Sequence, residues 1–454
     1  MTETIGEERP NGKFARRLGL IGATNIGLGA MLGGGIYVIS GTAAGMIGPA
    51  LVFAYLVTGA LTVFTAINYS ELACSIPKQG GGYTFAHDTW GGFPGFLTGW
   101  FLLIGNVVAC GLYSLAVAHT LAVFLPGDPG LIVGWIAIVI IVITFVTNLV
   151  SIKGVTGVLG VLNIAQALVL FVFIAVGLFF INPANLDPIL KEGTGITQFM
   201  ATVSFIYISF VGFELITTAS EEIKDPARNI PRAIVLTLFI ATNVYMLAAF
   251  VIVGVVPYTS IADSPTPISD VYGFMLGPGA FIVGLAGMAA SNYAALNATF
   301  LATARVAYSM GRDGNLPKLF SRVSSRFKTP IPALVASLLV VSAFALTGNV
   351  HLVASLSDFG YLIGLAIVNA SVIQLKRKGL GVPGTFKARF YPAIPILGVV
   401  SCLMLVPTLS PNTLELGALL SLAGLVIYLV YARSSHRRHN EQLNAITNAR
   451  DQQR

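Results

Sequence analysis

The chain has 454 residues, of which 55% are hydrophobic and only 10% are charged. This composition is too apolar for a soluble globular protein of this length, so it excludes soluble enzymes and soluble binding domains. The net charge of +7 comes from basic residues that are spread over short loops, so we expect no nucleic-acid partner.

Apolar runs of about 20 residues recur along nearly the whole chain, and each can cross the roughly 30 Å hydrocarbon core of a bilayer as an α-helix. The run LIVGWIAIVIIVITFVTNLV is apolar on every face, unlike the alternating strands of a membrane barrel. The sequence therefore predicts an all-α integral membrane protein with about twelve transmembrane helices. In chain order the expected spans are 18–45, 49–73, 93–125, 131–149, 155–181, 198–220, 232–255, 279–310, 331–347, 352–374, 391–409 and 413–432.

Basic residues predict the orientation of these spans. Residues 1–17 are polar and end in basic residues, and the following apolar run lacks a small-residue cleavage site, so we expect a cytoplasmic tail instead of a cleaved leader. An even number of spans then places the tail 433–454 and the loops 74–92, 150–154, 221–231, 311–330 and 375–390 in the cytoplasm. Of the 26 Lys and Arg residues, only Lys191 falls outside, in the extracellular loop 182–197. We expect a multi-pass protein of the cell membrane with both termini cytoplasmic.

The first span contains the stretch IGLGAMLGGGIY, in which Gly33, Gly34 and Gly35 follow one another. Each glycine weakens a helix by about 1 kcal/mol relative to alanine. In hydrocarbon a break persists only where its freed backbone groups find partners. The N–H groups of the resumed half-helix suit a carboxylate and the carbonyls of the first half suit an ammonium, and a free α-amino acid carries both. The alternative is a small-residue packing face that uses Gly29 and Gly33.

The sixth span carries a second interruption at SFVGFE, Ser209 to Glu214. Spans one and six open two blocks of five spans, 18–181 and 198–374, and two peripheral helices at 391–432 follow. Because five is odd, the second block must cross the membrane in the opposite sense. This is the pattern of an inverted-topology repeat, in which paired breaks mark the binding site.

Cofactor and metal motifs are not expected. Three scattered cysteines, Cys74, Cys110 and Cys402, fit neither a disulfide framework nor a metal site. The glycines of span one do not follow a strand in the dinucleotide-binding spacing, and no Walker motif appears. The absence of a clustered His, Cys or paired-acid site argues against a membrane-embedded enzyme.

Several blocks of sequence resemble the amino acid-polyamine-organocation superfamily of secondary transporters. They are IGLGAMLGGGIY in span one, GGGYTFAHDTWGGFPGFLTGW before span three, SFVGFELITTASEEIKDPARNIPRAI after the second break, and NATFLATARVAYSMGRDGNLPKLF at the end of span eight. The resemblance covers nearly the whole chain. It implies the LeuT-type 5+5 inverted repeat, first seen in the bacterial leucine transporter, with broken helices 1 and 6 and two added peripheral spans.

The resemblance also implies positions for the substrate groups. The substrate carboxylate would bind the amides of Gly34 and Gly35, and its ammonium would bind carbonyls in both breaks. Phe210 is similar to an aromatic that closes over the substrate, with ordinary packing as the alternative. Asn106 matches an asparagine that touches the substrate side chain, with a bond to a neighbouring helix as the alternative. The predicted substrate-binding residues are Met31, Gly33, Gly34, Gly35, Asn106, Ile208, Phe210, Val211 and Gly212.

Three residues are candidates for ion coupling. Glu214 directly follows the second break and is the candidate proton carrier, with a hydrogen-bonded structural acid as the alternative. Gln166 lies where some proton-coupled relatives place a lysine, and Ser291 lies where a sodium-binding hydroxyl would sit. An ionised acid at the bilayer centre costs about 2.5–3.5 kcal/mol on insertion scales, so the second intramembrane acid, Asp358, also invites a role, as a gate or in packing.

These observations predict a secondary active transporter that moves amino acids across the plasma membrane by alternating access, with protons as the expected coupling ion. Amino acid exchange and sodium symport are the alternatives within this class. A channel is the alternative of another class, and the scarcity of charge within the spans argues against it. The sequence leaves the substrate side chain and the oligomeric state open.

Overall fold

The computed structural model describes residues 18–432, except 77, 79, 127–128, 151–152, 221, 325–326, 328 and 382–385. These residues form helices, and their only β-type pairing is an isolated bridge between Leu18 and Ile223. Eight stretches of the described chain are long and apolar enough to cross a membrane, and four shorter apolar helices accompany them. The predicted class of an all-α, multi-pass membrane protein is therefore confirmed at this level.

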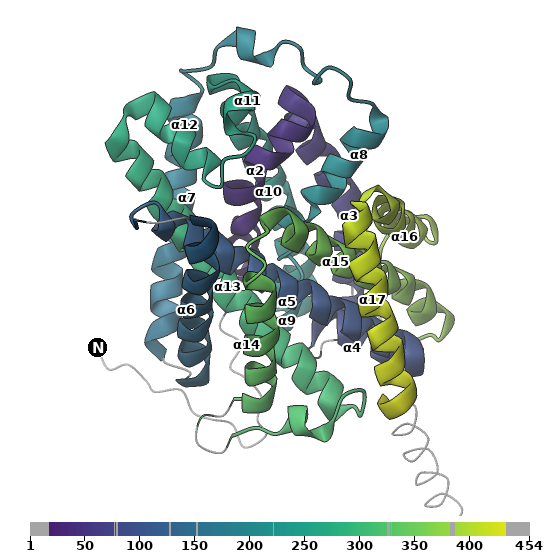
Figure 1. The fold of residues 1–454 in the computed structure, drawn as a ribbon. Coiled ribbons are helices and arrows are strands. Elements are labelled where there is room, and N and C mark those ends of the chain that lie inside the picture. The colour runs from purple at the N-terminus through teal and green to yellow at the C-terminus, as the bar shows by residue number, and fades with distance from the viewer. Residues whose placement is uncertain are drawn as a thin grey trace, which may run out of the picture.

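Figure 1 shows the helices in chain order, and longer connections follow α7, α13 and α15. The α-helices are α1 (Leu20–Met31), α2 (Gly34–Ile47), α3 (Leu51–Ser75), α4 (Gly81–Trp90), α5 (Gly92–Ala122), α6 (Pro129–Val150), α7 (Lys153–Gly177), α8 (Ile196–Phe205), α9 (Leu215–Thr218), α10 (Pro226–Val255), α11 (Tyr258–Ile261), α12 (Pro267–Leu276), α13 (Pro278–Arg312), α14 (Ile331–Ala345), α15 (Val350–Arg377), α16 (Ala393–Leu405) and α17 (Pro411–Ile427). The short 3-10 and π segments are η1 (Gly48–Ala50), η2 (Pro183–Leu186), η3 (Tyr207–Phe210), η4 (Lys318–Ser321), η5 (Val406–Thr408) and η6 (Tyr428–Ala432).

Two connections contain helices that the sequence analysis did not predict. Helix α4 lies within the predicted cytoplasmic loop 74–92 and begins after Gly80, which has a φ of 112°. Helices α11 and α12 occupy the connection between α10 and α13. These segments are too short to cross a bilayer, so a search for apolar runs of about 20 residues passes over them.

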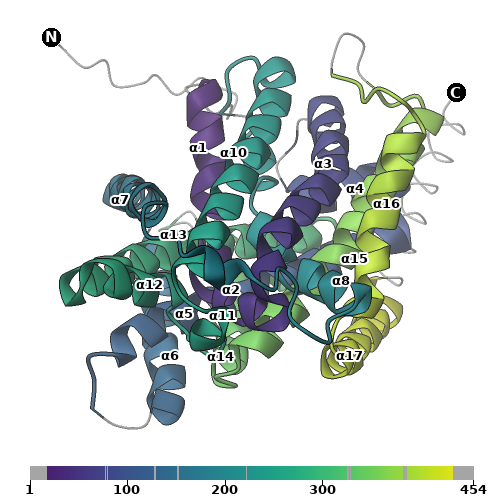
Figure 2. The same cartoon turned by 90° about the horizontal axis from the view of Figure 1, so that it is seen from above.

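Helices α5, α13 and α15 form the centre of the protein, where α5 packs against both of the others. A side chain on Gly360 of α15 would meet the backbone nitrogen of Gly105 on α5 at 2.7 Å, so the two backbones touch directly. Such close approach through small residues is typical of helix packing within membranes. Helix α1 lies along α10, and α10 also packs against α3 (Figure 2).

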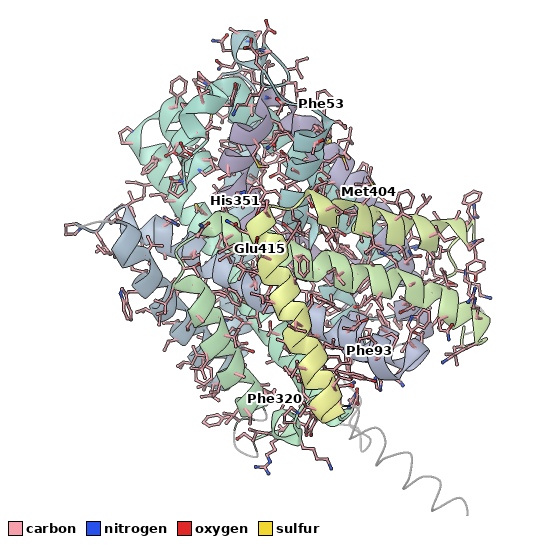
Figure 3. The ribbon with its side chains drawn as sticks, turned by 45° about the vertical axis from the view of Figure 1, so that its right-hand side comes forward. Phe53, Phe93, Phe320, His351, Met404 and Glu415 are labelled. Carbon is pink, nitrogen blue, oxygen red and sulfur yellow. The ribbon has the colours of Figure 1, made fainter. Side chains whose placement is uncertain are left out.

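The outside of the bundle is strongly apolar. Trp135 on α6, Phe171 on α7 and Leu419 on α17 each expose more than three fifths of their surface. Figure 3 shows labelled apolar side chains such as Phe53 and Met404 on this surface. Contiguous exposed apolar side chains on this scale suit contact with lipid tails and do not suit contact with water.

Candidate functional site

The first span is interrupted between Met31 and Gly34. Helix α1 ends at Met31, α2 begins at Gly34, and Leu32 and Gly33 between them are not helical. The N-cap position of α2 is Gly33, which has no side chain to bond the first backbone N–H groups of the helix. Ser291 of α13 reaches the same gap, where its hydroxyl donates a 2.8 Å hydrogen bond to the carbonyl of Leu32.

The second interruption lies between α8 and α9 and is longer than predicted. Helix α8 ends at Phe205, and η3 leads into an irregular turn that ends at Glu214. The prediction that the interruption begins at Ser209 is therefore wrong by a few residues. The amide of Ser209 bonds back to the carbonyl of Ile206 at 3.0 Å, so a 3-10 turn replaces the last α-helical turn.

Gly212 shapes the second half of this turn. Its φ of 134° lies in a region that residues with a side chain rarely adopt. The amide of Gly212 donates a 2.7 Å hydrogen bond to the carboxyl oxygen Oε2 of Glu214. The break therefore supplies one of its own partners, and Glu214 stands at the point where the helix resumes.

The two breaks lie against each other at the centre of the protein. A side chain on Gly35 would collide with Ser209, including its Cα atom, and a side chain on Gly212 would approach the nitrogen of Met31 to 2.9 Å. The hydroxyl of Tyr245 on α10 lies within hydrogen-bond distance of the carbonyls of both Met31 and Ser209, which share its one proton. The structure thus brings the predicted residues of spans one and six together, and Tyr245 joins them.

Two of the three predicted ammonium-binding carbonyls, those of Met31 and Ile208 but not that of Val211, have a hydrogen bond between described residues. The carbonyl of Met31 accepts from Tyr245, and that of Ile208 accepts from the amide of Val211 at 3.1 Å. A carbonyl oxygen has a second lone pair, so these bonds leave room for one more donor on each. Phe210 packs edge-on against Tyr245, with ring centroids 5.2 Å apart, which matches the packing alternative for this residue.

A cavity of about 40 Å³ borders the second break and contains Asn106 and Glu214 in its wall. Its volume holds about one to three water molecules. The amide oxygen of Asn106 accepts a 2.8 Å hydrogen bond from the hydroxyl of Tyr361, so Asn106 bonds to a neighbouring helix. The lining residues are Tyr69, Gly80, Gly81, Gly82, Leu102, Asn106, Glu214, Leu215, Thr218, Ala302, Arg305, Val306 and Tyr361.

The three ion-coupling candidates do not share this cavity. Glu214 borders it, Ser291 reaches the first break, and Gln166 lies buried on α7. The side-chain nitrogen of Gln166 donates to Asn163 at 3.1 Å, and its backbone carbonyl accepts from Tyr37 of α2 at 3.1 Å. Gln166 is therefore tied to the resumed half of span one through Tyr37. The described residues contain no group of three His, Cys, Asp or Glu that could hold a metal ion.

Sequence reasoning missed two residues of this region. Arg305 on α13 lines the same cavity as Glu214. A positive charge inside the predicted span 279–310 was a usable signal for it. Tyr245 connects the two breaks, but it is one of 15 tyrosines and sits in an ordinary apolar span, so no local pattern marks it.

Two further buried acids differ in their partners. Glu71 of α3 pairs with Lys376 of α15 at 3.1 Å and accepts a 2.9 Å bond from the amide of Ala388. Asp358, also on α15, is fully buried, and neither of its carboxyl oxygens has a hydrogen-bond partner among the described residues. The partners of Glu71 are those of an acid with a structural role. Asp358 has no such partners, although buried polar groups are nearly always hydrogen-bonded.

Comparison with known proteins agrees with this architecture. The profile of the amino acid permease family matches residues 18–431. The chain belongs to this family. It is 29% identical to the branched-chain amino acid permease of Bacillus subtilis, over 95% of both chains. It is equally similar, at 29%, to the methylthioribose transporter of the same organism, over 95% of this chain and 96% of that protein. It is also 27% identical to the vacuolar cationic amino acid transporter 4 of Arabidopsis thaliana, over 80% of this chain and 64% of that protein.

The family assignment confirms the predicted resemblance to the amino acid-polyamine-organocation superfamily. It places the chain among the membrane transporters of the amino acid permease family.

Proposed function

We propose that the chain is a secondary active transporter that carries free α-amino acids across the plasma membrane by alternating access. The observation that carries this proposal is the pair of broken spans. They meet at the centre of the protein, with uncapped N–H groups at the start of α2 and backbone carbonyls at Met31 and Ser209 beside them. Such a pair offers donors for a carboxylate and acceptors for an ammonium within one site.

The packing of the helices supports a five-plus-five inverted repeat within about twelve spans. In such a repeat, span one corresponds to span six, span two to span seven and span three to span eight. Helix α3 packs against α10, α5 packs against α13, and the two breaks touch. Corresponding elements that meet in pairs are expected around a pseudo-two-fold axis. We assign 18–181 and 198–374 to the two repeats and 391–432 to peripheral helices.

In this arrangement both termini face the cytoplasm, and the loop 182–195 and η4 lie at opposite ends of the molecule (Figure 1). The cavity beside Glu214 then lies on the cytoplasmic side of the breaks, because it is lined by Gly80 and by Gly81 and Gly82 at the start of α4, within the predicted cytoplasmic loop 74–92. An amino acid does not fit into about 40 Å³, so transport requires the two breaks to separate. Rocking of one group of helices against the other would provide that separation.

The substrate carboxylate would bind the amides of Gly34 and Gly35, and its ammonium the carbonyls of Met31, Ile208 and Val211. Protons are the coupling ion in this proposal, and Glu214 is the acid that exchanges them on the cytoplasmic side. A sodium symporter would use Ser291 and the carbonyl of Leu32 as oxygen ligands instead. An exchanger would need no ion.

Uptake into proteoliposomes tests this function. We would reconstitute the full chain and measure uptake of a panel of labelled amino acids, with pH and sodium gradients imposed separately. Saturable counterflow of at least one amino acid is expected, since a channel cannot exchange its substrate. The panel should include methylthioribose, which has neither a carboxylate nor an ammonium group. Counterflow of methylthioribose without any amino acid would contradict the proposed binding mode.

A variant pair tests the carboxylate position. Gly34→Leu places a large side chain at the start of α2 and should abolish amino acid binding. Gly160→Leu is the matched control, because Gly160 is exposed on α7 and no atom lies within 4 Å of a Cβ atom at this position. Both variants should insert and remain monodisperse in detergent. Normal affinity in Gly34→Leu would show that the carboxylate binds elsewhere.

A further inference from the structure

Asp358 is a buried acid whose carboxyl group has neither a hydrogen-bond nor an ion-pair partner among the described residues. It lies about 12 Å along α15 from Val350, by the 1.5 Å rise of an α-helix, and none of its surface is exposed. Neither carboxyl oxygen meets a hydrogen-bond donor among the described residues. The three ion pairs that the described residues form use Asp88, Asp313 and Glu71, not Asp358.

Neighbouring side chains hold this part of α15 firmly against α5. The hydroxyl of Ser357 donates to the carbonyl of Gly105 at 2.9 Å, and Tyr361 donates to Asn106 at 2.8 Å. Asp358 lies about 100° around the helix from Ser357. Its carboxyl lies near the backbone amide of Ile208 in η3, without the geometry of a hydrogen bond. Asp358 therefore sits on a fixed helix and is directed toward the broken segment of span six.

The elements packed against α15 carry other titratable or charged groups, and none of them pairs with Asp358 among the described residues. They include Tyr37 of α2, Tyr55, Tyr69 and Glu71 of α3, Tyr83, His87 and Asp88 of α4, Cys110, Tyr113 and His119 of α5, Tyr207 of η3, Cys402 of α16, Glu415 of α17, and, on α15 itself, His351, Tyr361 and Lys376.

An ionised carboxylate without partners is unstable in this environment. The insertion cost is about 2.5–3.5 kcal/mol even before unmade hydrogen bonds are considered, so in this conformation the group must hold a proton or another cation. No group of three His, Cys, Asp or Glu forms around Asp358 among the described residues, so a multivalent metal ion has no acidic site there. The neighbouring group at Ile208 is an N–H donor, which repels a metal ion or an ammonium. A proton is the ligand that fits.

We propose that Asp358 binds the coupling proton on the outer side of the helix breaks, as the partner of Glu214 on the cytoplasmic side. When the broken segment of span six moves away from α15, Asp358 gains access to water and exchanges its proton with the outside. When that segment closes on α15, the carboxyl must be protonated, so closure with substrate carries a proton inward. This inference rests on the proposed transport function and extends it to a residue outside the substrate contacts.

The test uses the full chain in proteoliposomes and the amino acid found by the substrate panel. Asp358→Asn keeps the shape of the side chain but cannot release a proton. We expect wild-type uptake to rise at least 10-fold under an inward proton gradient, and this stimulation to fall to less than twofold in Asp358→Asn. Counterflow without a gradient should stay within about threefold of wild type. A pH-sensitive dye inside the vesicles should report substrate-driven acidification for the wild type only.

Two further variants separate proton binding from structure. Glu415→Gln removes an exposed acid from the outer end of α17, where Figure 3 shows it near His351, and should keep full gradient-driven uptake. Asp358→Glu restores a titratable group and should recover part of the stimulation. Full gradient-driven accumulation by Asp358→Asn would overturn the proposal. Parallel loss of counterflow and gradient-driven uptake in both Asp358 variants would also overturn it, since that pattern indicates a structural residue.

The outcome for the wild type keeps this inference distinct from the proposed function. If the wild type exchanges an amino acid but ignores the proton gradient, the role of Asp358 is wrong while the transport function stands. If it exchanges no amino acid at all, the proposed function fails, and the inference fails with it.

Discussion

The two broken spans provide hydrogen-bond partners for their freed backbone groups in different ways. The break in span one is two residues long; Ser291 of α13 bonds the carbonyl of Leu32 within it, and Tyr245 of α10 bonds the carbonyl of Met31 just before it. The break in span six runs from Ile206 to Glu214 and supplies much of its own bonding, through the 3-10 turn of η3 and the bond from Gly212 to Glu214. The first break therefore consists of backbone that lacks covering side chains, and the second adds a titratable group.

This difference assigns separate tasks to the two breaks. Backbone N–H groups at the start of a helix recognise an anionic group without any side chain, so the first break suits the constant part of an amino acid. A carboxylic acid at the second break can change its charge, so that break suits the coupling of transport to protons. Substitutions at each break should show whether substrate recognition and proton coupling can be impaired independently.

Gly35→Ala should give the largest effect. Its new methyl group would collide with the Cα and side chain of Ser209, and backbone atoms cannot move aside as a flexible side chain can. We expect a loss of at least about 3 kcal/mol of stability in this closed arrangement. The measurements are the apparent melting temperature in detergent and the rate of counterflow.

Gly160→Ala is the matched control for this substitution, because a methyl group there meets no atom within 4 Å. It removes a glycine from the exposed side of α7, so its melting temperature should stay equal or rise slightly. If Gly35→Ala and Gly160→Ala have the same melting temperature and the same rate of counterflow, close contact between the two breaks is not required for stability or transport.

Much of this fold could be predicted from the sequence because the bilayer imposes strong rules. Apolar runs of sufficient length must form helices, so each expected span overlaps a helix of the structure, and three consecutive glycines marked the first break. The extra helices α4, α11 and α12 are short and lie in connections, where those rules do not apply. The start of the second break was misplaced because a 3-10 turn needs no special residue.

The candidate site was harder to predict than the fold. Glycines and an acid within an apolar span are recognisable from the sequence alone, so Gly33, Gly212 and Glu214 could be predicted as site residues. The partners of Tyr245 are remote in sequence: its hydroxyl contacts the carbonyl of Met31, which lies 214 positions earlier in the chain, and that of Ser209, which lies 36 positions earlier. The partner of a backbone carbonyl across such separations depends on helix packing, which a single sequence does not encode locally. The same reason kept the partners of Phe210 and Asn106 open.

Gly212→Ala tests the second break and should have an intermediate effect. The φ of 134° strains any residue with a side chain, and the new methyl group would also approach the nitrogen of Met31 to 2.9 Å. We expect about 2 kcal/mol of destabilisation from strain and contact together. Gly277→Ala is the control, since Gly277 has a φ of 85° but no atom within 4 Å, and it should lose only about 1 kcal/mol. Equal melting temperatures for the two variants would show that contact between the breaks contributes nothing.

Tyr245→Phe should have the smallest effect and tests the link between the breaks. The variant keeps the ring that packs against Phe210 and Tyr55 but removes the hydroxyl whose one proton the carbonyls of Met31 and Ser209 share. A buried hydrogen bond in a membrane protein contributes about 0.6 kcal/mol on average and about 1.7 kcal/mol at most, so we expect a loss of about 1 kcal/mol for this shared bond. Tyr272→Phe is the matched control, because that hydroxyl makes a single 2.6 Å bond to Val169 away from the breaks. A melting temperature for Tyr245→Phe no lower than that of Tyr272→Phe would mean that the hydroxyl does not hold the two breaks together. If it does hold them, its loss frees one acceptor site on each of two carbonyls, and the affinity for the substrate ammonium should change even though the stability falls only slightly.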